Sequence, residues 1–498
     1  MYNFTEITQD YLQNLVDFLY SISWMYKVLN TQYVKENVLS ENREFLSLLE
    51  KIDLNEFVNA KEPQNNHPKE LQKLIENVNF FRINFDIINT ESWKCNNQQK
   101  KMSVKKLYEI ENIGKLINEI CKDEVTTLVD LGSGLGYLDE YLHTSYGYKI
   151  IGLEGSANNQ ERAVKRQEKY YAESIGKVKH VHHFITMDSG DFILKEVDDV
   201  NKVEELTKES ANIENKSQDS DSDPAKVALF GLHPCGDLSI VCIKLFLNID
   251  RVKKLIFSPC CYHKMSGTTA DFVEFNYYPL SQTVKELEAK YPTNPFLRPF
   301  LRLAGQQSPI KFKEMTELEH FVHGKNMFER GVVEAVLIDN ETSKRVNNVT
   351  FSEGRLKFED IKLKYQILDK VSSTPKPWTS EHEEKFNKIR NLHPKGEEMS
   401  ENLFCLQTAV QNSCENLVIM DRVFYIYEQM KSLWFISNGF SDDNSCEQCD
   451  FDRYNMKLSL KYHLNHLECL YEYVWHKVGV YLVEKQNMKE IRSKCAQY

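Results

Sequence analysis

The spacing of apolar residues changes along this chain, and each change predicts a different kind of structure. Over residues 1–94, apolar side chains recur at the three- and four-residue intervals of a helix, as at Leu12, Leu15 and Leu19. From about residue 95 to residue 340, that period gives way to short apolar runs that alternate with helical segments. Such alternation predicts a parallel sheet with helices packed on its faces.

Five of these apolar runs are predicted to form the parallel strands of the sheet. They begin at Glu124, Lys149, His180, Val227 and Lys253, and each one leads into polar residues. The carboxyl ends of parallel strands meet at one edge, so these polar residues should face one crevice. The predicted fold class is therefore α/β, with a Rossmann-like sheet, a helical N-terminal region and helical insertions.

The same patterns divide the chain into segments. Residues 1–94 are predicted to be a helical N-terminal region, followed by the Rossmann-like domain over 95–340. Within that domain, the acidic, serine-rich stretch of about 195–224 has few apolar residues, so we expect a disordered surface insertion there. Residues 341–436 are expected to form a helical insertion. The C-terminal segment 437–498 should complete the sheet, because Lys477-Val-Gly-Val-Tyr-Leu-Val483 resembles a last strand.

Composition narrows the class of protein. The chain has 498 residues, of which 41% are hydrophobic, and no apolar run approaches the roughly 18 residues of a membrane span. Its 12 cysteines are scattered rather than arranged as a dense disulfide framework, which favours a reducing location in the cytoplasm or nucleus. The formal net charge of −11 opposes broad affinity for nucleic acid, so we expect no DNA partner. Because no apolar run is long enough to span a membrane, we expect no membrane association either. Nothing in the sequence indicates an oligomeric state.

A glycine-rich turn follows the first predicted strand. Asp130 precedes Gly132, Gly134 and Gly136, and a helix is predicted directly afterwards, over Tyr137–Tyr146. Small residues let a ligand approach the main chain, and a helix N-terminus offers unpaired N–H groups and partial positive charge. This turn is typical of a site for a dinucleotide or a nucleoside.

Two acids that end the next strands are expected to hold the same ligand. The second strand ends at Glu154, about 20 residues beyond the turn, where an acid grips a ribose diol. The Gly-x-Gly-x-Gly spacing differs from the Gly-x-Gly-x-x-Gly of nicotinamide sites, which favours S-adenosylmethionine as the cofactor. Asp188, at the end of the third strand, is expected either to meet the adenine edge or to cap a helix before Ser189.

The fourth and fifth strands end in bases, thiols and an acid. The residues expected to frame an acceptor are His233, Asp237, Cys260 and His263. Three hypotheses follow from these residue types. In the first, a histidine deprotonates the acceptor. In the second, the Cys260 thiolate adds covalently to a ring, as in cytosine carbon-5 methyltransferases, and in the third, the neighbouring cysteines and a histidine bind a metal. A fourth interpretation is that the cluster only shapes the substrate mouth.

Two of these segments, with the glycine turn, carry a resemblance to a known family. Gly231-Leu-His-Pro-Cys-Gly-Asp-Leu238 and Ser258-Pro-Cys-Cys-Tyr-His263 resemble the methyltransferase-like protein 25 family, whose relatives include the ribosomal RNA adenine dimethylase domain-containing proteins. The resemblance covers most of residues 100–430. It implies a class I methyltransferase sheet, S-adenosylmethionine bound at the glycine turn and methyl transfer as the activity.

The resemblance identifies the cofactor but leaves several methyl acceptors open. Elements similar to His-x-Cys-Gly and Cys-Cys-His occur in tRNA 2′-O-methyltransferases of the acceptor stem, which favours RNA as a partner. Adenine dimethylases carry an Asn-x-Pro-Tyr-type element where this chain has Leu232-His-Pro-Cys235, which argues against the adenine amino group. The alternatives are a protein methyltransferase and a non-catalytic protein that binds S-adenosylmethionine as an interaction or sensing element.

A separate pattern lies near the C-terminus. Cys446, Cys449, His463 and His466 approach the spacing of a zinc finger with two cysteine and two histidine ligands. The interval between the two histidines is one residue shorter than the common range, and ordinary surface thiols and helical histidines give the alternative interpretation. These four residues are the metal candidates from sequence.

Overall fold

The computed structural model describes residues 2–3, 9–84, 86–87, 102–209, 225–267, 274–305, 312–347, 354–438, 459–462 and 479–484. The chain divides into two compact units. We call the first the helical unit, made of Met1–Asn84, Thr269–Glu274 and Thr283–Asp421, and the second the sheet unit, made of Phe85–Thr268, Phe275–Gln282 and Arg422–Tyr498.

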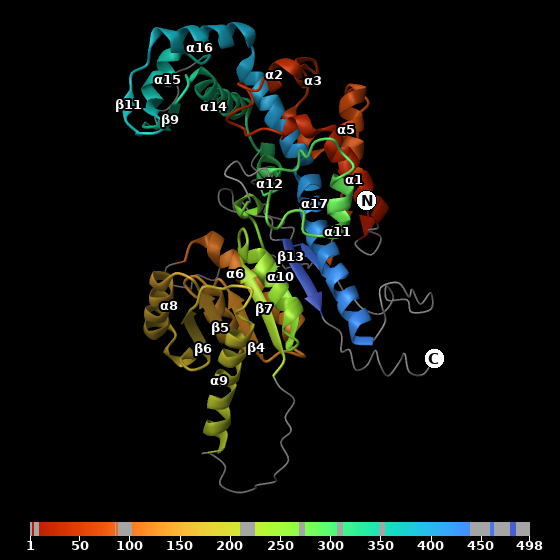
Figure 1. Ribbon diagram of the computed structural model, residues 1–498, viewed down its shortest axis with the longest axis vertical. Helices are drawn as coiled ribbons and strands as arrows, with labels where there is room; N and C mark the ends of the chain where they lie inside the picture. The colour runs from red at the N-terminus through yellow and green to blue at the C-terminus, as the bar shows by residue number, and fades with distance from the viewer. Residues whose placement is uncertain are drawn as a thin grey trace. The chain divides into compact units, whose positions relative to one another are not determined.

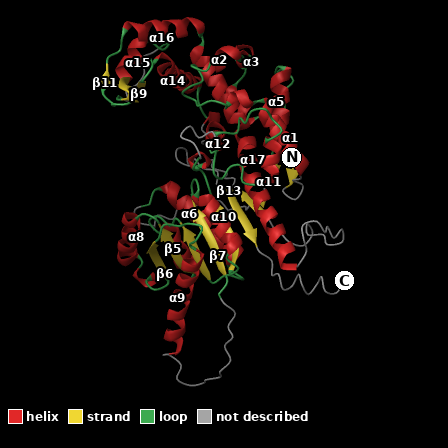
Figure 2. Cartoon of the chain, in the orientation of Figure 1, coloured by secondary structure: helices red, strands yellow, loops and turns green. Residues whose placement is uncertain are grey.

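The sheet unit is built on an eight-stranded sheet (Figures 1 and 2). Its strands, in the spatial order β3-β12-β13-β8-β7-β4-β5-β6, are β3 (Asp86–Ile87), β12 (Ser459–Tyr462), β13 (Gly479–Glu484), β8 (Val252–Ser258), β7 (Val227–Leu232), β4 (Thr127–Leu131), β5 (Lys149–Glu154) and β6 (Val178–His182). The strands from β8 to β6 are parallel, and β13 pairs antiparallel with both β8 and β12. This order confirms the predicted α/β Rossmann-like class. It also gives β13 the place that the last strand was predicted to take.

Helices alternate with the parallel strands. α6 (Val104–Cys121) precedes β4, and α7 (Tyr137–Tyr146), α8 (Ala157–Tyr170), α9 (Gly190–Glu209) and α10 (Leu238–Asn248) follow β4, β5, β6 and β7 in turn, with short 3-10 turns η3 (Ala172–Ser174) and η4 (Tyr262–Lys264). Side chains alternate across the strands, so both faces of the sheet are filled. One face, with Leu128, Ile150 and Phe230, packs against α6 and α7. On the other face, Val129 and Leu229 are also fully buried.

The acidic stretch from about 195 to 224 differs from the prediction in its first half. Residues 195–209 are helical, since α9 runs from Gly190 to Glu209. The reason is visible in Ile193, Val197 and Val200, whose helical spacing gives this segment an apolar stripe that is fully or almost fully buried. The prediction of disorder rested on the acidic composition of the segment and overlooked this apolar stripe. The rest of the stretch, 210–224, lies outside the described residues.

The third strand is shorter than predicted. It ends at His182, so Asp188 lies in a turn beyond the strand, immediately before α9. The first strand is also displaced, to Thr127–Leu131 from the predicted 124–129. In contrast, β5 and α7 have the predicted bounds.

The helical unit contains nearly all of the described N-terminal residues and most of the segment before the C-terminal strands. Its helices are α1 (Gln9–Ser21), α2 (Val38–Glu41), α3 (Arg43–Ser47), α4 (Leu54–Asn59), α5 (Lys69–Phe80), α11 (Gln282–Glu288), α12 (Arg298–Ala304), α14 (Glu317–Val336), α15 (Phe358–Lys364) and α16 (Ser380–Leu392), with the 3-10 turn η2 (Ser23–Met25). The 43-residue helix α17 (Gly396–Asn438) belongs to this unit up to Asp421 and to the sheet unit from Arg422. A two-stranded parallel pair, β1 (Tyr2–Asn3) and β2 (Ile83–Asn84), joins the ends of the N-terminal region.

The predicted helical insertion 341–436 is not wholly helical. A three-stranded antiparallel sheet is formed by β9 (Glu341–Arg345), β10 (Tyr365–Asp369) and β11 (Pro375–Lys376). β9 reads Glu-Thr-Ser-Lys-Arg and is half-buried to exposed, so it carries no apolar alternation that would identify a strand.

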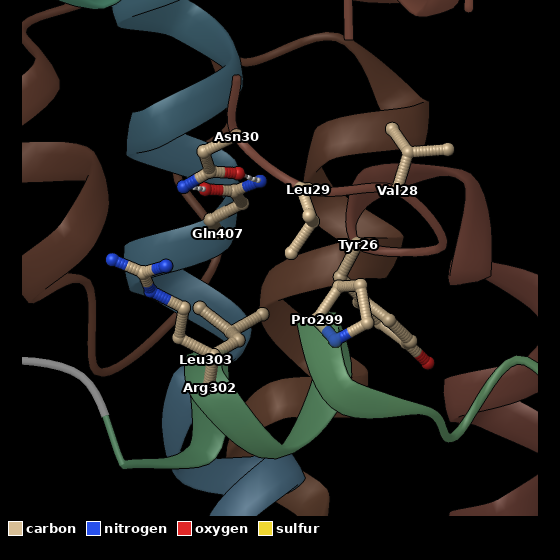
Figure 3. A pocket seen from close by; sticks show the side chains of 8 residues that line it. All are labelled: Tyr26, Val28, Leu29, Asn30, Pro299, Arg302, Leu303 and Gln407. Atoms are coloured by element: carbon tan, nitrogen blue, oxygen red, sulfur yellow. Dashed lines mark hydrogen bonds between the residues drawn. The ribbon is translucent and has the colours of Figure 1, made fainter. Parts of the chain in front are cut away.

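A small pocket lies in the helical unit between residues 26–30, α12 and α17 (Figure 3). Asn30 and Gln407 close one side through reciprocal amide hydrogen bonds of 3.2 and 3.0 Å, and Gln407 Nε2 also donates to the Met25 carbonyl at 2.7 Å. The two amides therefore donate to each other, and Gln407 also donates to the backbone. The pocket lining includes one charged side chain, Arg302, which offers no pairing of groups for catalysis.

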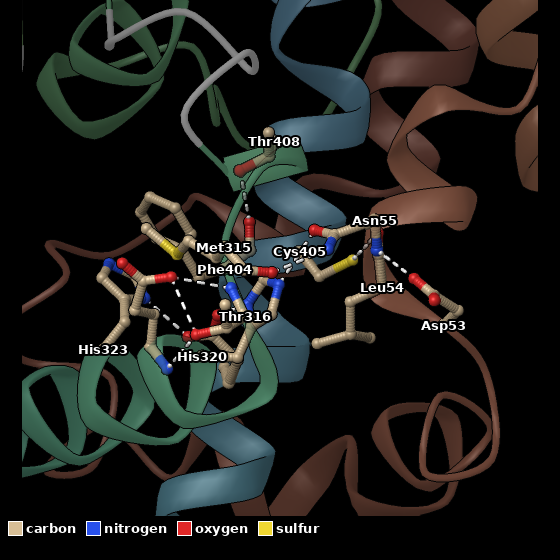
Figure 4. A network of polar contacts seen from close by, with 12 residues as sticks. Asp53, Leu54, Asn55, Met315, Thr316, His320, His323, Phe404, Cys405 and Thr408 are labelled. Carbon is tan, nitrogen blue, oxygen red and sulfur yellow. Dashed lines mark hydrogen bonds and ion pairs between the residues drawn. The ribbon is translucent and has the colours of Figure 1, made fainter. Parts of the chain in front are cut away.

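A polar network ties α14 to α17 in the same unit (Figure 4). His320 Nδ1 and His323 Nδ1 contact the two carboxylate oxygens of Glu401 at 2.6 and 2.5 Å. Asn55 Nδ2 donates to the Met315 carbonyl at 2.8 Å, which leaves its Oδ1 to accept from His320 Nε2 at 2.9 Å. Both ring nitrogens of His320 therefore contact oxygen atoms, one of Glu401 and one of Asn55. We interpret the network as a set of buried polar contacts that stabilises the unit.

Among the described residues, no helix combines the length and the apolar character needed to cross a membrane.

Candidate functional site

The strand order creates a switch point between β4 and β7. The chain continues from β4 to β5 and β6 on one side, and returns to β7 and β8 on the other. Connections therefore leave these two neighbours in opposite directions, and in open α/β sheets ligands bind outside the carboxyl ends of the strands at such a point. The residues predicted to contact cofactor or acceptor lie at the ends of β4, β5, β7 and β8 or in the loops that follow these strands, and Asp188 lies in the loop after β6.

The glycine turn has a backbone that only small residues adopt easily. Gly132, Gly134 and Gly136 have φ values of +103°, +60° and +68°. The N–H groups of Gly132 and Ser133 both donate to the Leu153 carbonyl at the end of β5, at 3.0 and 3.1 Å. Gly136 is the N-cap of α7, and a Cβ added to it would collide with the ring of His180. A Cβ at Gly134 would meet nothing within 4 Å, so the main chain there is open to a ligand.

Glu154 joins the turn to the second strand. Its Oε2 accepts from the Gly134 N–H at 2.9 Å, and its Oε1 accepts from the Ser156 N–H at 2.8 Å. Ser156 is also the N-cap of α8, where its Oγ accepts from the Asn159 N–H. Each carboxylate oxygen has two lone-pair directions, so two acceptor positions stay available for a ligand diol. The structure thus brings Gly134 and Glu154 together, as the sequence predicted.

Buried acids lie behind the turn. Asp130 is 3% exposed, and Asp139 and Glu140, in the first turn of α7, are 0% and 1% exposed. Burial raises the pKa of Asp130 to about 7, and burial together with the charge of Asp130 raises the pKa of Asp139 well above its usual range. His180 contacts Asp139 and Glu140, with Nδ1 at 3.5 Å from Asp139 Oδ2 and Nε2 at 3.3 Å from Glu140 Oε1. The group is placed to support the turn rather than to touch a ligand.

The loop between β6 and α9 presents an aromatic side chain. Ser189 Oγ accepts from the Thr186 N–H at 2.9 Å and lies 2.8 Å from His183 Nε2, so this loop is fixed. Phe184 is nevertheless 77% exposed, and its ring edge would lie 3.3 Å from a Cβ on Gly155, next to Glu154. Asp188 is exposed, and its own N–H donates to Thr186 Oγ1 at 3.3 Å.

His233 follows β7 in a left-handed conformation, with φ of +67°. Its N–H donates to the Ser258 carbonyl at 3.1 Å, which links the ends of β7 and β8. Its Nε2 lies 3.6 Å from Oε2 of Glu109 on α6, and Glu109 also lies 3.7 Å from Lys106 Nζ. The His233 side chain is 25% exposed whereas that of Glu109 is 6% exposed, so a buried carboxylate lies beside a ring that solvent can reach.

Three thiols meet where β7 and β8 end. Cys235 Sγ lies 3.1 Å from Cys260 Sγ, and Cys260 Sγ lies 3.5 Å from Cys261 Sγ. Hydrogen bonding from the Cys260 thiol lowers the pKa of Cys235 to about 5, and the same contact raises the pKa of Cys260. Cys260, the predicted nucleophile, therefore contacts both of the neighbouring thiols. Its role as a nucleophile stays a prediction.

The remaining predicted residues lie in the same two loops. Asp237, the N-terminal flank of α10, accepts from the Ser266 N–H through Oδ1 at 2.9 Å. His263 is half-buried in η4. The C-terminal candidates Cys446, Cys449, His463 and His466 all lie outside the described residues.

Sequence reasoning missed Glu109, Phe184 and the His180 cluster. Glu109 lies on a helix before the first strand, and no local motif connects it with His233. Phe184 falls within the predicted third strand, which begins at His180. A signal for His180 was present, because a histidine in a predicted strand requires polar partners when it is buried.

The sheet order, the glycine turn and the acid at the end of β5 define a nucleoside-binding domain of the class I methyltransferase type. Residues 105–268 match the family described as a methyltransferase domain, which agrees with this fold. The chain therefore carries a methyltransferase domain, as predicted.

Particular relatives match shorter segments. A 69-residue segment is 36% identical to the probable methyltransferase-like protein 25 of Homo sapiens and covers 14% of this chain and 11% of that protein. The corresponding Mus musculus protein is 33% identical over 69 residues, 14% of this chain and 12% of that protein. The resemblance to this family is confirmed for that segment, while the matched part spans only about a tenth of the relatives' length.

Solved methyltransferase structures resemble this chain only at low sequence identity. The TrmK structure of M. capricolum with S-adenosyl-homocysteine has a TM-score of 0.19, 17% identity, and covers 31% of this chain and 51% of that one. Coclaurine N-methyltransferase bound to N-methylheliamine and SAH has a TM-score of 0.21, 12% identity, and covers 82% of this chain and 90% of that one. The fold class rests on the strand order of this chain and on the methyltransferase domain match.

Proposed function

We propose that this chain is an S-adenosylmethionine-dependent methyltransferase whose acceptor is RNA. When bound, the cofactor supplies an electrophilic methyl group on a sulfonium centre. The chain supplies the crevice, the cofactor contacts and a base. The observation that carries the proposal is the 2.9 Å hydrogen bond from the Gly134 N–H to Glu154, because it joins the two motifs expected to hold a nucleoside.

The cofactor contacts follow from the geometry of this edge. The Glu154 carboxylate is fixed by two N–H groups and retains acceptor positions for the ribose hydroxyls. The open main chain at Gly134 accommodates the methionine part, and Phe184 offers an exposed ring for the adenine face. Asp188 is the acid proposed for the adenine edge, and Asp130 supports the turn from behind.

His233 is the proposed general base. It receives the proton that an acceptor hydroxyl loses as its oxygen bonds to the methyl carbon. Glu109 orients the ring and stabilises the imidazolium that forms, as a carboxylate does in other histidine pairs. Asp237 and His263 shape the acceptor side of the crevice. The chain thus acts through alignment of the acceptor with the methyl group, together with one proton transfer.

RNA is favoured over protein as the acceptor because the loops after β7 and β8 carry the sequence elements similar to those of tRNA 2′-O-methyltransferases. Broad electrostatic attraction does not provide the affinity, since the chain has a net charge of −11. We therefore propose a specific RNA structure as the partner rather than RNA in general.

Calorimetry with S-adenosyl-homocysteine tests cofactor binding. The full chain should bind one equivalent, and Gly134→Arg should abolish binding by filling the open turn. Gly147→Arg is a matched control at the other end of α7, because Gly147 also has a positive φ, +80°, and open space around its Cβ. Equal binding by Gly134→Arg and the unchanged chain contradicts the proposed site.

Turnover is tested with labelled S-adenosylmethionine and fractionated cellular RNA and protein. Label in an RNA fraction supports the proposal, and label in protein alone replaces RNA with a protein acceptor. For the base, His233→Gln should remove methylation while cofactor binding stays unchanged, and Glu109→Gln should lower the rate and shift its pH profile. Cofactor binding with no label in any fraction supports the sensing alternative.

A further inference from the structure

The loops after β7 and β8 are held together by contacts that lie outside the cofactor site. Gly236 has φ of +60°, and a Cβ there would lie 2.8 Å from the Lys264 carbonyl oxygen, so the two loops approach as closely as glycine permits. Asp237 Oδ1 accepts from the Ser266 N–H at 2.9 Å on the same side. These contacts fix Cys235 opposite the adjacent pair Cys260 and Cys261.

Adjacent cysteines usually point in different directions, and here they do not. Cys261 lies three residues beyond the end of β8 and has φ of −109° and ψ of 64°. Its Sγ lies only 3.5 Å from that of Cys260. All three sulfur atoms lie within 4.8 Å of one another, and among the described residues this is the one cluster of cysteine, histidine or acidic groups with metal-ligand spacing.

We propose that Cys235, Cys260 and Cys261 form a three-thiolate site for a soft divalent cation, with zinc as the first candidate. Zinc binds thiolate sulfur at about 2.3 Å in a tetrahedron, which places two sulfurs roughly 3.8 Å apart. The observed separations of 3.1 and 3.5 Å reach that value with shifts of a few tenths of an ångström. Thiolate ligands select soft cations over magnesium and calcium.

Three protein ligands leave the fourth position of a tetrahedron open to water or to an atom of a substrate. Each thiol that is still protonated releases its proton to solvent on binding, so the site forms with the loss of up to three protons and no change of oxidation state. Cys260 then serves as a ligand and is not available as a nucleophile. The site neither requires nor implies methyl transfer.

Metal analysis of the full chain, purified with a reductant and loaded with zinc chloride, tests this site. The Cys235→Ser/Cys260→Ser variant should lose one equivalent of zinc relative to the unchanged chain. Cys242→Ala, a buried thiol on α10, should keep it. Cys446→Ser/Cys449→Ser separates the C-terminal candidates and should also keep this equivalent. Unchanged zinc content in Cys235→Ser/Cys260→Ser overturns the proposal.

Alkylation mapped by mass spectrometry gives a readout that needs no variant. Zinc should protect Cys235, Cys260 and Cys261 from iodoacetamide in the unchanged chain, and a chelator should expose them. Equal alkylation with and without zinc overturns the proposal. Recovery of an intact disulfide between Cys235 and Cys260 after zinc loading overturns it as well.

Discussion

Replacement of Glu154 by glutamine tests the proposed ribose contact with the smallest change of shape. The amide keeps one oxygen but loses the charge, and its NH₂ group must face either the Gly134 N–H or the Ser156 N–H, which are both donors. A hydrogen bond to a charged acceptor contributes about 1.5–3 kcal/mol. If the substitution costs about 2–3 kcal/mol of binding free energy, the Kd for S-adenosyl-homocysteine rises about 30- to 150-fold.

Calorimetry of the full chain measures this change, and a thermal melt without ligand reports any effect on the turn itself. Glu161→Gln is the matched control, because Glu161 lies on the following helix, α8, with its side chain 65% exposed and an ion pair to Lys165 at 3.8 Å. Exposed pairs of this kind contribute about 1 kcal/mol or less to stability, and this one has no part in the proposed contact. A Glu154→Gln chain that melts normally and binds within about threefold of the unchanged chain would refute the ribose contact.

Three further predictions concern the walls of the crevice. Gly136→Ala should lower the free energy of unfolding in urea by about 2 kcal/mol or more, since a left-handed backbone costs about 1–2 kcal/mol and the new methyl group meets His180; an unchanged midpoint would contradict this. The raised pKa of Asp130 means that the folded chain binds its proton more tightly, so the free energy of unfolding should fall as pH rises from about 4 to about 7, by up to about 1.4 kcal/mol per pH unit. Asp130→Asn should flatten that slope in urea titrations, whereas the exposed control Asp191→Asn should keep it. Phe184→Ala should weaken S-adenosyl-homocysteine binding by about 3- to 10-fold, in line with an aromatic contact of roughly 0.5–1.5 kcal/mol, without a change in melting temperature; unchanged binding would show that the ring has another role.

Local signals explain what could be predicted. β5 and α7 have the predicted bounds, because an apolar run that ends in an acid and a glycine turn before a helix are both encoded within a few residues. The last apolar run was also predicted to complete the sheet, because a strand needs a pairing partner, although its pairing with β8 was not predicted.

Long-range contacts explain what was missed. The pairing of Glu109 with His233 connects a helix before the sheet with a loop far along the chain. The polar strand β9 is held by its pairing with β10 rather than by an apolar pattern of its own. The helical start of the acidic stretch was missed for a different reason. Val197 is buried and holds α9 in place, although the composition of the segment indicates disorder.

The position of β13 affects how this domain can be produced for experiments. The segment that matches a methyltransferase domain ends at residue 268, but the strand that covers β8 comes from residues 479–484. A fragment cut at the end of the match would expose the edge of β8, with its unpaired backbone groups and the apolar run Leu255-Ile-Phe257. Such an edge recruits strands from other molecules, so the fragment should aggregate even though every residue of the glycine turn is intact. Recombinant versions of this domain therefore need the C-terminal strands, supplied either in the same chain or as a second polypeptide.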